Sequence, residues 1–322
     1  MPDRLRRLRR TPALRALTRE THVRPAQLIY PIFVGETLKK SVPIDSMPGQ
    51  SRQSLASLPE LLDRIEKLGI GAVIFFGIPA NKDERASSAY DKDGVVQQAI
   101  KIAKQVPRNL VVMTDVCVCA YTPHGHCGVL HGEEVDNDAS LDLLAKTAAS
   151  HARAGADVVA PSSMMDHQVA AIREALDEQG FPDTAIMAYS AKFASGFYGP
   201  FRDAADSSPS FGDRSSYQHD PANSRHAKLE FFADEDEGAD ILMVKPGLPY
   251  LDILSQGRRL TDLPMAIYNV SGEYSMIKAA SERGWLDEKR VVLELLTAFR
   301  RAGADLIITY HALEAAQWLN ES

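Results

Sequence analysis

A pattern that recurs four times along the chain limits its fold more than any other feature of the sequence. Each copy joins a helix-like end, a glycine and an apolar run, and the copies lie at residues 68–76, 154–161, 237–244 and 302–309. The glycine stands where the C-terminus of a helix favours a left-handed residue. The apolar run is rich in β-branched residues, as a strand buried on both faces requires. The pattern therefore predicts repeated units of helix and strand.

Four further apolar runs fit the role of strands, at residues 28–34, 110–118, 185–190 and 265–270. Helical periodicity lies between most of the strands, at residues 54–68, 95–105, 141–154, 168–179, 227–237 and 288–301. Eight alternating strands and helices, without a second compositional block, predict one α/β domain of the TIM (β/α)8 barrel type. A doubly wound open sheet is the alternative, but neither a Gly-x-Gly-x-x-Gly turn nor a Walker A loop supports it.

Two segments lie outside the repeat. Residues 1–27 form an N-terminal extension. We expect it to be an exposed arm that either packs on a neighbouring subunit or lies in solvent. Residues 196–223 are a long polar stretch after the fifth strand, and inserts of this kind are usually lids or binding loops. We therefore expect an arm at 1–27 and a single barrel domain at 28–322, with a lid at about 196–223.

Composition narrows the classes of partner. Of the 322 residues, 45% are hydrophobic and 25% are charged, which is typical of a globular protein. The net charge of −7 argues against nucleic acid as the main partner, because phosphate binding needs a basic surface. No apolar run approaches the length that spans a bilayer, and no apolar region of a secretory signal follows the arginines at residues 4–10. We expect a cytoplasmic protein without a membrane partner.

Polar side chains follow the predicted strands at the same end. In a TIM barrel the chemistry collects at the C-terminal ends of the strands. The residues at these ends are Asp115, Cys117, Cys119, Ser162, Ser163, Lys192, Lys245, Ser271, Tyr310 and His311. A whole rim of such groups predicts a site.

Two lysines of this rim point most specifically to a type of chemistry. Lys245 directly follows an apolar strand, and Lys192 occupies the equivalent place one strand earlier. Burial and a neighbouring cation both lower the pKa of a lysine. A neutral amine attacks ketones and forms Schiff bases. A salt bridge at the rim is the alternative for either lysine alone, but two on adjacent strands favour chemistry.

The only three cysteines of the chain, Cys117, Cys119 and Cys127, fall within eleven positions. An odd, clustered set is a poor disulfide framework and a better metal site. Three thiolates with no obvious fourth ligand are typical of a catalytic zinc with one open position. His124, His126 and His131 lie nearby, and each could be a fourth ligand, a supporting group or a solvated loop residue. Three reduced, partly buried thiols are the alternative.

Two arginines of the predicted lid, Arg202 and Arg214, form a further candidate site. Paired guanidinium groups on a loop can clamp a carboxylate through forked hydrogen bonds. The alternative is a pair of solvated loop arginines.

Short motifs follow one another along nearly the whole chain. They stand at residues 10–12, 30–34, 76–79, 114–119, 125–128, 160–162, 189–195, 197–202, 212–214, 243–246 and 268–274. Together they resemble the porphobilinogen synthases, also called 5-aminolevulinate dehydratases. The resemblance implies a dehydratase of the lyase class that joins two molecules of 5-aminolevulinate into porphobilinogen, with loss of two waters, in tetrapyrrole biosynthesis.

The resemblance also implies roles for the candidate residues. Lys245 forms a Schiff base with the first substrate, Lys192 engages the second, and Asp115 and Ser162 complete the catalytic set. The residues that hold the first substrate's carboxylate are Ser271 and Tyr310, and those that hold the second's are Arg202, Arg214 and Gln218.

For metals and assembly, the family implies three further expectations. Cys117, Cys119 and Cys127 bind a catalytic zinc ion, which polarises the carbonyl of the second substrate or binds its amino group. Glu230 matches a position that binds an allosteric magnesium ion in many bacterial members. Residues 4–21 serve as an assembly arm in a homo-oligomer, usually an octamer.

Two positions depart from the family pattern. Ser163 replaces an acidic residue that commonly follows the serine at position 162, and Ala86 stands where a glycine is more usual. Neither residue carries a central role in the expected mechanism, although Ser163 could change the polarity near the second substrate.

Other functions explain part of the sequence only. A lysine-dependent aldolase on the same barrel accounts for Lys245 but not for the cysteines or the second lysine. A zinc hydrolase accounts for the cysteines and leaves both lysines without a role. A structural or regulatory zinc-binding barrel predicts a closed metal site and no Schiff base.

Overall fold

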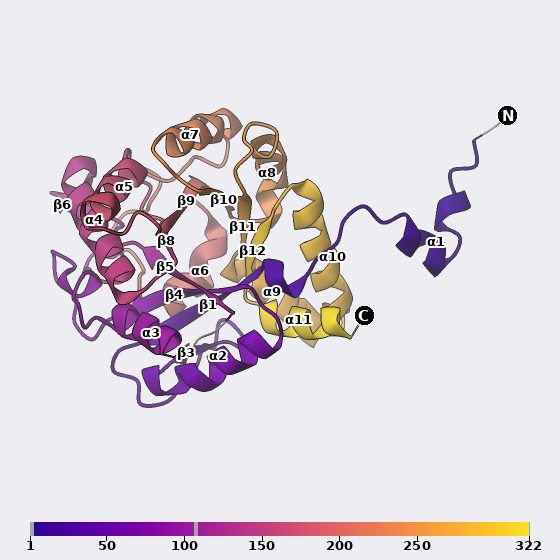
Figure 1. Cartoon of the computed structure of the whole chain (residues 1–322), viewed down its shortest axis with the longest axis horizontal. Helices are drawn as coiled ribbons and strands as arrows, with labels where there is room; N and C mark the ends of the chain where they lie inside the picture. The colour runs from indigo at the N-terminus through magenta and orange to yellow at the C-terminus, as the bar shows by residue number, and fades with distance from the viewer. Residues whose placement is uncertain (1–2, 106–108, 322) are drawn as a thin grey trace.

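The chain folds into a closed ring of parallel strands surrounded by helices (Figure 1). It is a computed structural model that describes residues 3–105 and 109–321. The ring consists of β1 (Leu28–Gly35), β4 (Ala72–Ile78), β5 (Val111–Val116), β8 (Val158–Pro161), β9 (Ala185–Lys192), β10 (Ile241–Lys245), β11 (Met265–Asn269) and β12 (Leu306–Thr309). Neighbours in the ring follow chain order, and β12 closes it by pairing with β1. The predicted TIM barrel is confirmed, and each of its strands overlaps a predicted one.

Short strands that the sequence did not predict lie beside the barrel. After β1 the chain forms β2 (Val42–Pro43) and β3 (Ser51–Gln53), and β3 extends the sheet at the C-terminal end of β1. A separate hairpin joins β6 (Val129–His131) and β7 (Glu134–Asp136). These strands are too short to show a periodic pattern, and β3 carries Arg52 to the mouth of the barrel.

The predicted helices are all present. They are α2 (Leu58–Lys67), α3 (Val95–Lys104), α4 (Asn137–Ala154), α5 (Gln168–Glu178), α7 (Ser224–Asp236) and α10 (Glu288–Ala302). The sequence missed α1 (Pro12–Leu17), α6 (Gly199–Ala204), α8 (Leu251–Gly257), α9 (Ser271–Glu282) and α11 (Ala312–Asn320). The start of α9 with Ser271 and Gly272 reads as a turn, and α1, α6 and α8 are too short for a clear period. Within the described residues, no helix has the length and apolar character needed to cross a membrane.

The recurring glycines end helices as predicted. Gly69, Gly155, Gly238 and Gly303 have φ angles of +74°, +109°, +100° and +121°. In each copy the next residue donates its N–H to a carbonyl five residues back, as Ala239 does to Asp234 at 2.9 Å. This left-handed cap satisfies carbonyls that the end of a helix leaves open, and it turns the chain into the next strand.

An aspartate in three of the copies starts the pairing of the following strand. The N–H of Asp305 donates to the Met265 carbonyl at 2.7 Å, while its carboxylate accepts the Met265 N–H at 3.0 Å. Asp157 and Asp240 hold the first residues of the preceding strands in the same way. In the first copy Gly71 takes this position, because a Cβ there would lie 2.2 Å from the carbonyl oxygen of Ala26.

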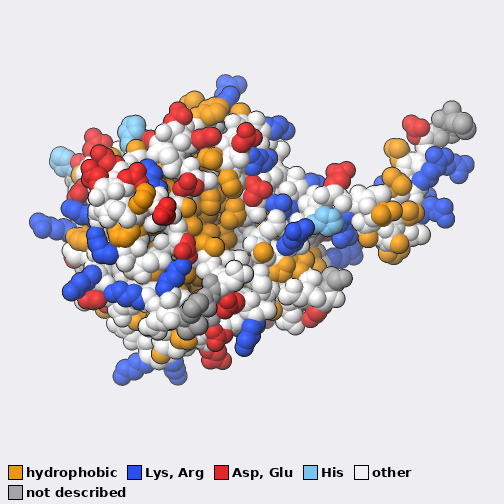
Figure 2. Space-filling model, viewed as in Figure 1, with side chains coloured by type: hydrophobic (Ala, Val, Ile, Leu, Met, Phe, Trp, Pro, Cys, Tyr) orange, Lys and Arg blue, Asp and Glu red, His pale blue; other side chains and the backbone are white. Residues whose placement is uncertain are grey.

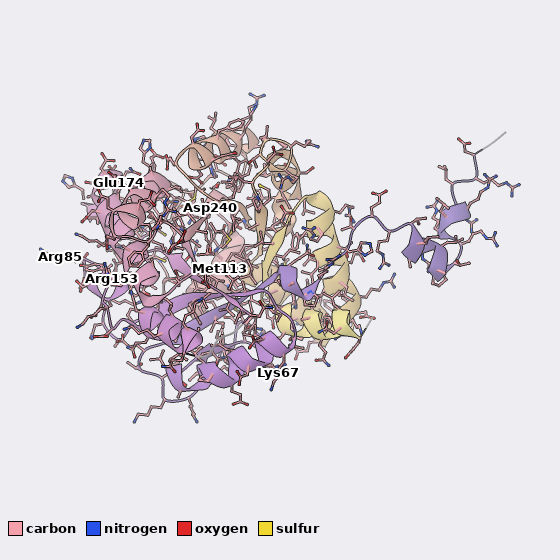
Figure 3. The ribbon with its side chains drawn as sticks, viewed as in Figure 1. Lys67, Arg85, Met113, Arg153, Glu174 and Asp240 are labelled. Carbon is pink, nitrogen blue, oxygen red and sulfur yellow. The ribbon has the colours of Figure 1, made fainter. Side chains whose placement is uncertain are left out.

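Alternate residues of each strand face two different layers of the core. Along β1, Leu28, Tyr30, Ile32 and Val34 pack outward against the helices. Ile29 and Phe33 point into the barrel, where Met113 of β5 also lies. Figure 3 shows Met113 inside the ring, whereas Lys67, Arg85, Arg153 and Glu174 lie at its periphery. The barrel interior is therefore filled with side chains, and open space for a site remains only at its ends.

The N-terminal segment projects away from the barrel (Figure 1). Its apolar side chains face outward on the side shown in Figure 2, and Leu5 and Leu17 are 79% and 81% exposed. The first two residues of the expected arm lie outside the described residues. The use of the arm in assembly stays a prediction.

We predict that Asp305→Asn lowers the free energy of unfolding by about 1–2 kcal/mol. The amide replaces a carboxylate that accepts the Met265 N–H and pairs with Arg258 at 3.1 Å. Equilibrium denaturant unfolding measures the change. The exposed Asp262 is the control, and its change to Asn should alter stability by less than about 0.5 kcal/mol. Equal effects of the two changes would contradict the role of Asp305.

Candidate active site

Lys192 and Lys245 lie side by side at the C-terminal end of the barrel. They are the last residues of β9 and β10, and the parallel pairing of these strands sets them opposite each other. Their exposed fractions are only 4% and 5%. The Nζ atom of Lys192 donates a hydrogen bond to the carbonyl oxygen of Ser162. The structure thus brings two of the candidate catalytic residues together.

Aromatic rings surround the amine of Lys245. Its Nζ lies 4.3 Å from the ring centre of Tyr268, 5.0 Å from that of Phe201, 5.1 Å from that of Tyr189 and 5.2 Å from that of Tyr198. Burial and, to a lesser extent, the charge of Lys192 lower the pKa of Lys245 to about 7, against the opposing charge of Asp115. A substantial fraction of this amine is therefore neutral near pH 7 and able to attack a carbonyl.

Asp115 provides a carboxyl group beside the two amines. It lies on β5, and its carboxyl is hydrogen-bonded to the side chain of Ser162. Burial raises the pKa of Asp115, whereas the charge of Lys192 and the Ser162 hydrogen bond act in the opposite direction. A carboxyl with a raised pKa next to an amine with a lowered one can exchange protons with it near neutral pH.

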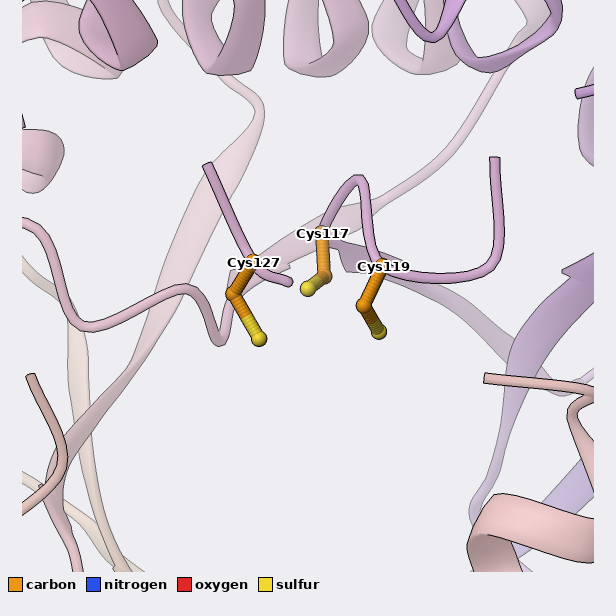
Figure 4. A group of neighbouring side chains, drawn as sticks. All are labelled: Cys117, Cys119 and Cys127. Carbon is orange, nitrogen blue, oxygen red and sulfur yellow. The ribbon is translucent and has the colours of Figure 1, made fainter. Parts of the chain in front are cut away.

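The three cysteines form a buried cluster after β5, which is separated from β9 by β8 (Figure 4). Cys117 and Cys119 directly follow β5, and the loop returns Cys127 to them, so that all three Sγ atoms lie within 4.8 Å of one another. Hydrogen bonds from Cys117 and Cys119 hold the pKa of Cys127 well below that of a free thiol. The neighbouring thiols and burial raise the pKa of Cys117 and of Cys119, so the thiolate character of the metal-free cluster is concentrated on Cys127.

The nearby histidines do not complete this cluster. Nδ1 of His126 lies 3.2 Å from Tyr217 Oη, and its Nε2 lies 3.2 Å from the Phe211 carbonyl oxygen. His124 accepts the His126 N–H at Nδ1, and His131 is exposed on the β6–β7 hairpin. Among the described residues the group of potential ligands contains the three cysteines only. His126 instead supports the loop that carries the cysteines, residues 117–127, which we call the cysteine loop.

The polar segment at 196–223 packs against the cysteine loop. Ser210 donates its N–H to the carbonyl of His124 at 3.0 Å, and Arg214 Nη2 donates to the carbonyl of Gly125 at 2.8 Å. Gly125 has φ +71°, and a Cβ there would lie 2.4 Å from the Ser208 carbonyl oxygen. Only glycine fits this close approach, which interlocks the two loops.

Two cations from the barrel loops hold the same segment over the barrel mouth. Arg52 donates to the carbonyls of Asp203 and Ala204 at 2.6 and 2.9 Å. Lys82 forms an ion pair of 2.7 Å with Asp206. These contacts hold the segment against the loops at the C-terminal end of the barrel, and its action as a lid stays a prediction.

Polar groups without partners point to a ligand under this segment. Within the part of the chain that the structure describes, the buried Nε atoms of Arg202 and Arg214 make no hydrogen bond, and neither do the amide atoms of Gln218. Burial lowers the pKa of Arg202, and the charge of Arg214 adds to this effect. Buried donors are normally satisfied, so these groups fit an anion that bonds to all three side chains.

Ser271 and Tyr310 already have partners. Ser271 Oγ accepts the N–H of Phe201 at 2.9 Å, which ties α6 of the polar segment to the start of α9. The hydroxyl groups of Tyr310 and Tyr268 lie 2.9 Å apart. Tyr268 packs against Lys245, so Tyr310 is linked to the lysine through one aromatic residue.

Glu230 lies apart from this centre. It is half-buried on α7 and lines a hollow with Asp166, Asp234 and Glu237. Burial raises the pKa of Glu230, and the charges of Asp166 and Glu237 raise it further. The hollow also reaches Gln218, but neither the lysines nor the cysteines line it.

Comparisons with known proteins agree with this geometry. The sequence model described as Delta-aminolevulinic acid dehydratase matches residues 2–318. Proteins named delta-aminolevulinic acid dehydratase in Synechococcus elongatus and Halalkalibacterium halodurans are 55% and 56% identical over 320 and 318 residues. These alignments cover 98% of this chain, with 98% and 96% of the respective relatives. The chain belongs to the delta-aminolevulinic acid dehydratase family.

A solved structure of the family extends the agreement to the fold. The dehydratase of Toxoplasma gondii, a porphobilinogen synthase determined with its reaction product porphobilinogen, superposes with a TM-score of 0.97 at 48% identity. The alignment covers 100% of this chain and 92% of that one. The predicted family, barrel and dehydratase activity are therefore confirmed. The roles of individual residues remain predictions.

The residues of the cysteine cluster fit a metal ion. Three sulfur ligands about 2.3 Å from one tetrahedral ion would be separated by roughly 3.8 Å, which lies within the limit that the Sγ atoms meet. All three side chains are buried, and Arg214 and Lys192 place positive charge near Cys127. The donor set is the one that soft or borderline cations prefer.

Sequence reasoning missed several residues of the dehydratase site. The rings of Tyr189, Tyr198, Phe201 and Tyr268 belong to the quoted motifs, but nothing in the linear pattern shows that they converge on Lys245. The contact of Tyr217 with the cysteine loop, where its hydroxyl accepts the Cys127 N–H at 3.4 Å, joins residues 90 positions apart. Such long-range contacts leave no local signal.

The two departures from the family pattern have different local consequences. Ala86 is fully buried at φ +48°, the left-handed region in which a glycine is favoured. Ser163 is also fully buried, and its hydroxyl has no hydrogen-bond partner among the described residues. Neither residue contacts the lysines through a described hydrogen bond.

We predict that the metal-free dehydratase binds Co²⁺ with strong near-ultraviolet absorption from thiolate-to-cobalt charge transfer. Cys127→Ser should lose this absorption, and its affinity should fall by more than about 100-fold, since even groups that only orient a ligand contribute 10- to 100-fold. Spectroscopic titration measures both, and excess Mg²⁺ is the control that should not compete. Unchanged absorption in Cys127→Ser would exclude the cluster as the site.

Proposed function

We propose that this chain makes porphobilinogen from two molecules of 5-aminolevulinate by forming an imine between the first substrate and Lys245. The observation that carries this proposal is the pair of buried lysines at adjacent strand ends, beside the cysteine cluster. In the sum of the reaction, both ketone oxygens leave as water, one new carbon–carbon bond and one new carbon–nitrogen bond form, and Lys245 is released.

The lysine pair supports the first step. The neutral Nζ of Lys245 attacks the ketone carbon of the first substrate, and the ketone oxygen leaves as water after protonation. The imine acidifies the carbon next to it and fixes one reactant in the site. Lys192 engages the second substrate and keeps the pKa of Lys245 low. Asp115, assisted by Ser162, moves protons at these amines.

The unpartnered groups under the lid support a clamp for the second substrate. Arg202, Arg214 and Gln218 bind its carboxylate, because both arginine Nε atoms and the Gln218 amide atoms are buried without partners in the described chain. Ser271 and Tyr310 bind the carboxylate of the first. Two anchored carboxylates orient both ketones in one site, which removes much of the entropic barrier of a bimolecular reaction.

Zinc is the metal we propose for the cysteine cluster. When bound by Cys117, Cys119 and Cys127, it supplies Lewis-acid activation of the second substrate. The protein itself excludes water from the site. The lid segment at 196–223, held by Arg52 and Lys82, excludes water that would hydrolyse the imine. Reduced thiols of this kind fit a reducing compartment, and we place the protein in the cytoplasm.

We further propose that residues 1–27 are an arm that packs on a second copy in a homo-octamer. The exposed apolar side chains of Leu5, Leu8 and Leu17 support this, since they have no cover in a single chain. Glu230, which lines an acidic hollow on α7, is proposed to bind an activating magnesium ion through carboxylate and water ligands.

Pyrrole formation tests the proposed role of the metal. The purified protein is incubated with 5-aminolevulinate under reducing conditions, and the product is assayed colorimetrically before chelation, after chelation and after return of zinc. We expect product to disappear with the metal and to return with zinc. Product that survives verified removal of the metal would keep the activity and reduce the metal to a structural role. No product from folded, zinc-loaded protein would overturn the proposal.

The pH dependence of imine formation tests the lysine assignment. The neutral fraction of Lys245 rises as pH increases through its pKa of about 7, so imine formation should rise between about pH 6 and 8 and then level off. Reductive trapping of substrate with cyanoborohydride, read by peptide mass, measures it at each pH. Exposed Lys40 is the internal control and should remain unlabelled. Labelling that is absent from Lys245, or still rises steeply above pH 9, would contradict the assignment.

A further inference from the structure

Glu273 is a buried carboxyl that the proposed reaction does not use. It lies in the first turn of α9, two residues after Ser271, and only 1% of it is exposed. A carboxylate buried this deeply is costly unless its oxygens accept hydrogen bonds. Its contacts therefore show what it holds in place.

Every described partner of Glu273 is a donor. Oε1 accepts the N–H of Leu248 at 2.6 Å, and Oε2 accepts the N–H of Val270 at 2.9 Å and the side-chain amide of Asn269 at 2.7 Å. The N–H of Gly247 is a further donor to this carboxyl. Burial raises the pKa of Glu273 to about 7 against the effect of these hydrogen bonds, so the ionised form, which satisfies all of these donors at once, predominates above neutral pH.

The hydrogen bonds continue to the next strand. Oδ1 of Asn269, the last residue of β11, accepts the hydroxyl of Thr309 at 2.8 Å. Thr309 is the last residue of β12, and its Oγ1 in turn accepts the N–H of His311 at 3.2 Å. Both Asn269 and Thr309 are fully buried.

This hydrogen-bond chain fixes three strand ends that carry the first-substrate residues. Leu248 is three residues after Lys245, Glu273 is two residues after Ser271, and Thr309 directly precedes Tyr310. The chain thus spans the ends of β10, β11 and β12 from behind the site. A shift of one strand end would therefore move Lys245, Ser271 or Tyr310 relative to the other two.

We propose that Glu273 is a positioning residue that sets Lys245 against the residues holding the first substrate's carboxylate, through the hydrogen-bond chain Leu248–Glu273–Asn269–Thr309. This inference rests on the proposed function, because it takes Lys245, Ser271 and Tyr310 as the first-substrate site. It adds that the site depends on a buried carboxyl group outside the set of residues proposed to bind the substrate.

The substitution Glu273→Gln removes the negative charge of the side chain while keeping its size and shape. Glutamine has nearly the same size, but its NH₂ group must face one of the donors that the carboxylate now accepts. The side chain can then no longer accept hydrogen bonds from both the loop after Lys245 and the start of α9. Misplacement of reacting groups by about 1 Å costs on the order of 100-fold in rate.

The experiment measures imine trapping on Lys245 in metal-loaded, full-length variants at saturating 5-aminolevulinate. Glu273→Gln should slow trapping on Lys245 by on the order of 10- to 100-fold. Glu273→Asp, which keeps the charge, should recover part of that loss. Thr309→Val removes the link between β11 and β12 and the acceptor of the His311 N–H but leaves the bonds of Glu273, so it should raise KM for product formation while leaving trapping at saturation within about threefold of the wild type.

Asp305→Asn is the matched control for stability. Asp305 also holds β11 next to β12, but at the opposite end of the barrel. It should lower Tm and leave trapping on Lys245 unchanged, whereas Glu273→Gln should slow trapping at temperatures well below its own Tm. If Glu273→Gln lowers Tm but traps substrate at the wild-type rate, the positioning role is wrong.

The outcomes also separate this inference from the proposed function. If wild-type protein traps no substrate on Lys245, the proposed function itself fails. If wild-type protein traps normally and Glu273→Gln does so too, only the inference fails. Should Glu273→Gln not fold, Glu273→Asp and Thr309→Val decide instead, and wild-type KM and trapping rate in both would overturn the inference.

Discussion

The burial of two lysine amines side by side is the constraint on which this site depends. The pairing of β9 with β10 sets Lys192 opposite Lys245, and burial among aromatic rings denies both amines the solvation that a charge needs. Two like charges this close in a poorly polarisable environment cannot both be retained at low cost. One lysine therefore becomes a nucleophile near neutral pH, and the strand register decides which residue it faces.

The barrel separates the groups that stabilise it from the groups that react. The glycine caps and the aspartates at positions 157, 240 and 305 lie where the strands begin, and they fix register with hydrogen bonds to the preceding strand. The lysines, Asp115 and the cysteines lie where the strands end. The polar segment at 196–223 packs on the cysteine loop at this end, and the hydrogen bonds of Glu273 and Asn269 connect three of its strand ends. Poorly solvated groups are tolerated at the C-terminal ends of the strands because the hydrogen bonds at the opposite end stabilise the barrel.

The sequence was sufficient for the features that depend on local pattern. The Gly-containing repeat and four further apolar runs predicted the strands of the ring, and the position of each lysine at a strand end placed Lys192 and Lys245 in one rim. The spacing of Cys117, Cys119 and Cys127 predicted their cluster. What it could not give are contacts between distant segments, such as Tyr217 on the cysteine loop, the rings around Lys245, and the bond from Asn269 to Thr309. His124 and His126 were open as ligands in the sequence, and the contacts of His126 with Phe211 and Tyr217 make it a supporting residue instead.

Direct titration of the Lys245 amine tests the central claim. In metal-loaded protein with ¹⁵N-labelled lysine side chains, the Lys245 resonance, assigned with Lys245→Met, is followed against pH by NMR. We expect a pKa of about 7 in the wild type and a higher one in Lys192→Met, where burial still lowers the pKa but the charge of Lys192 is gone. A pKa near the ordinary value of 10.5, or one that does not respond to Lys192→Met, would contradict it.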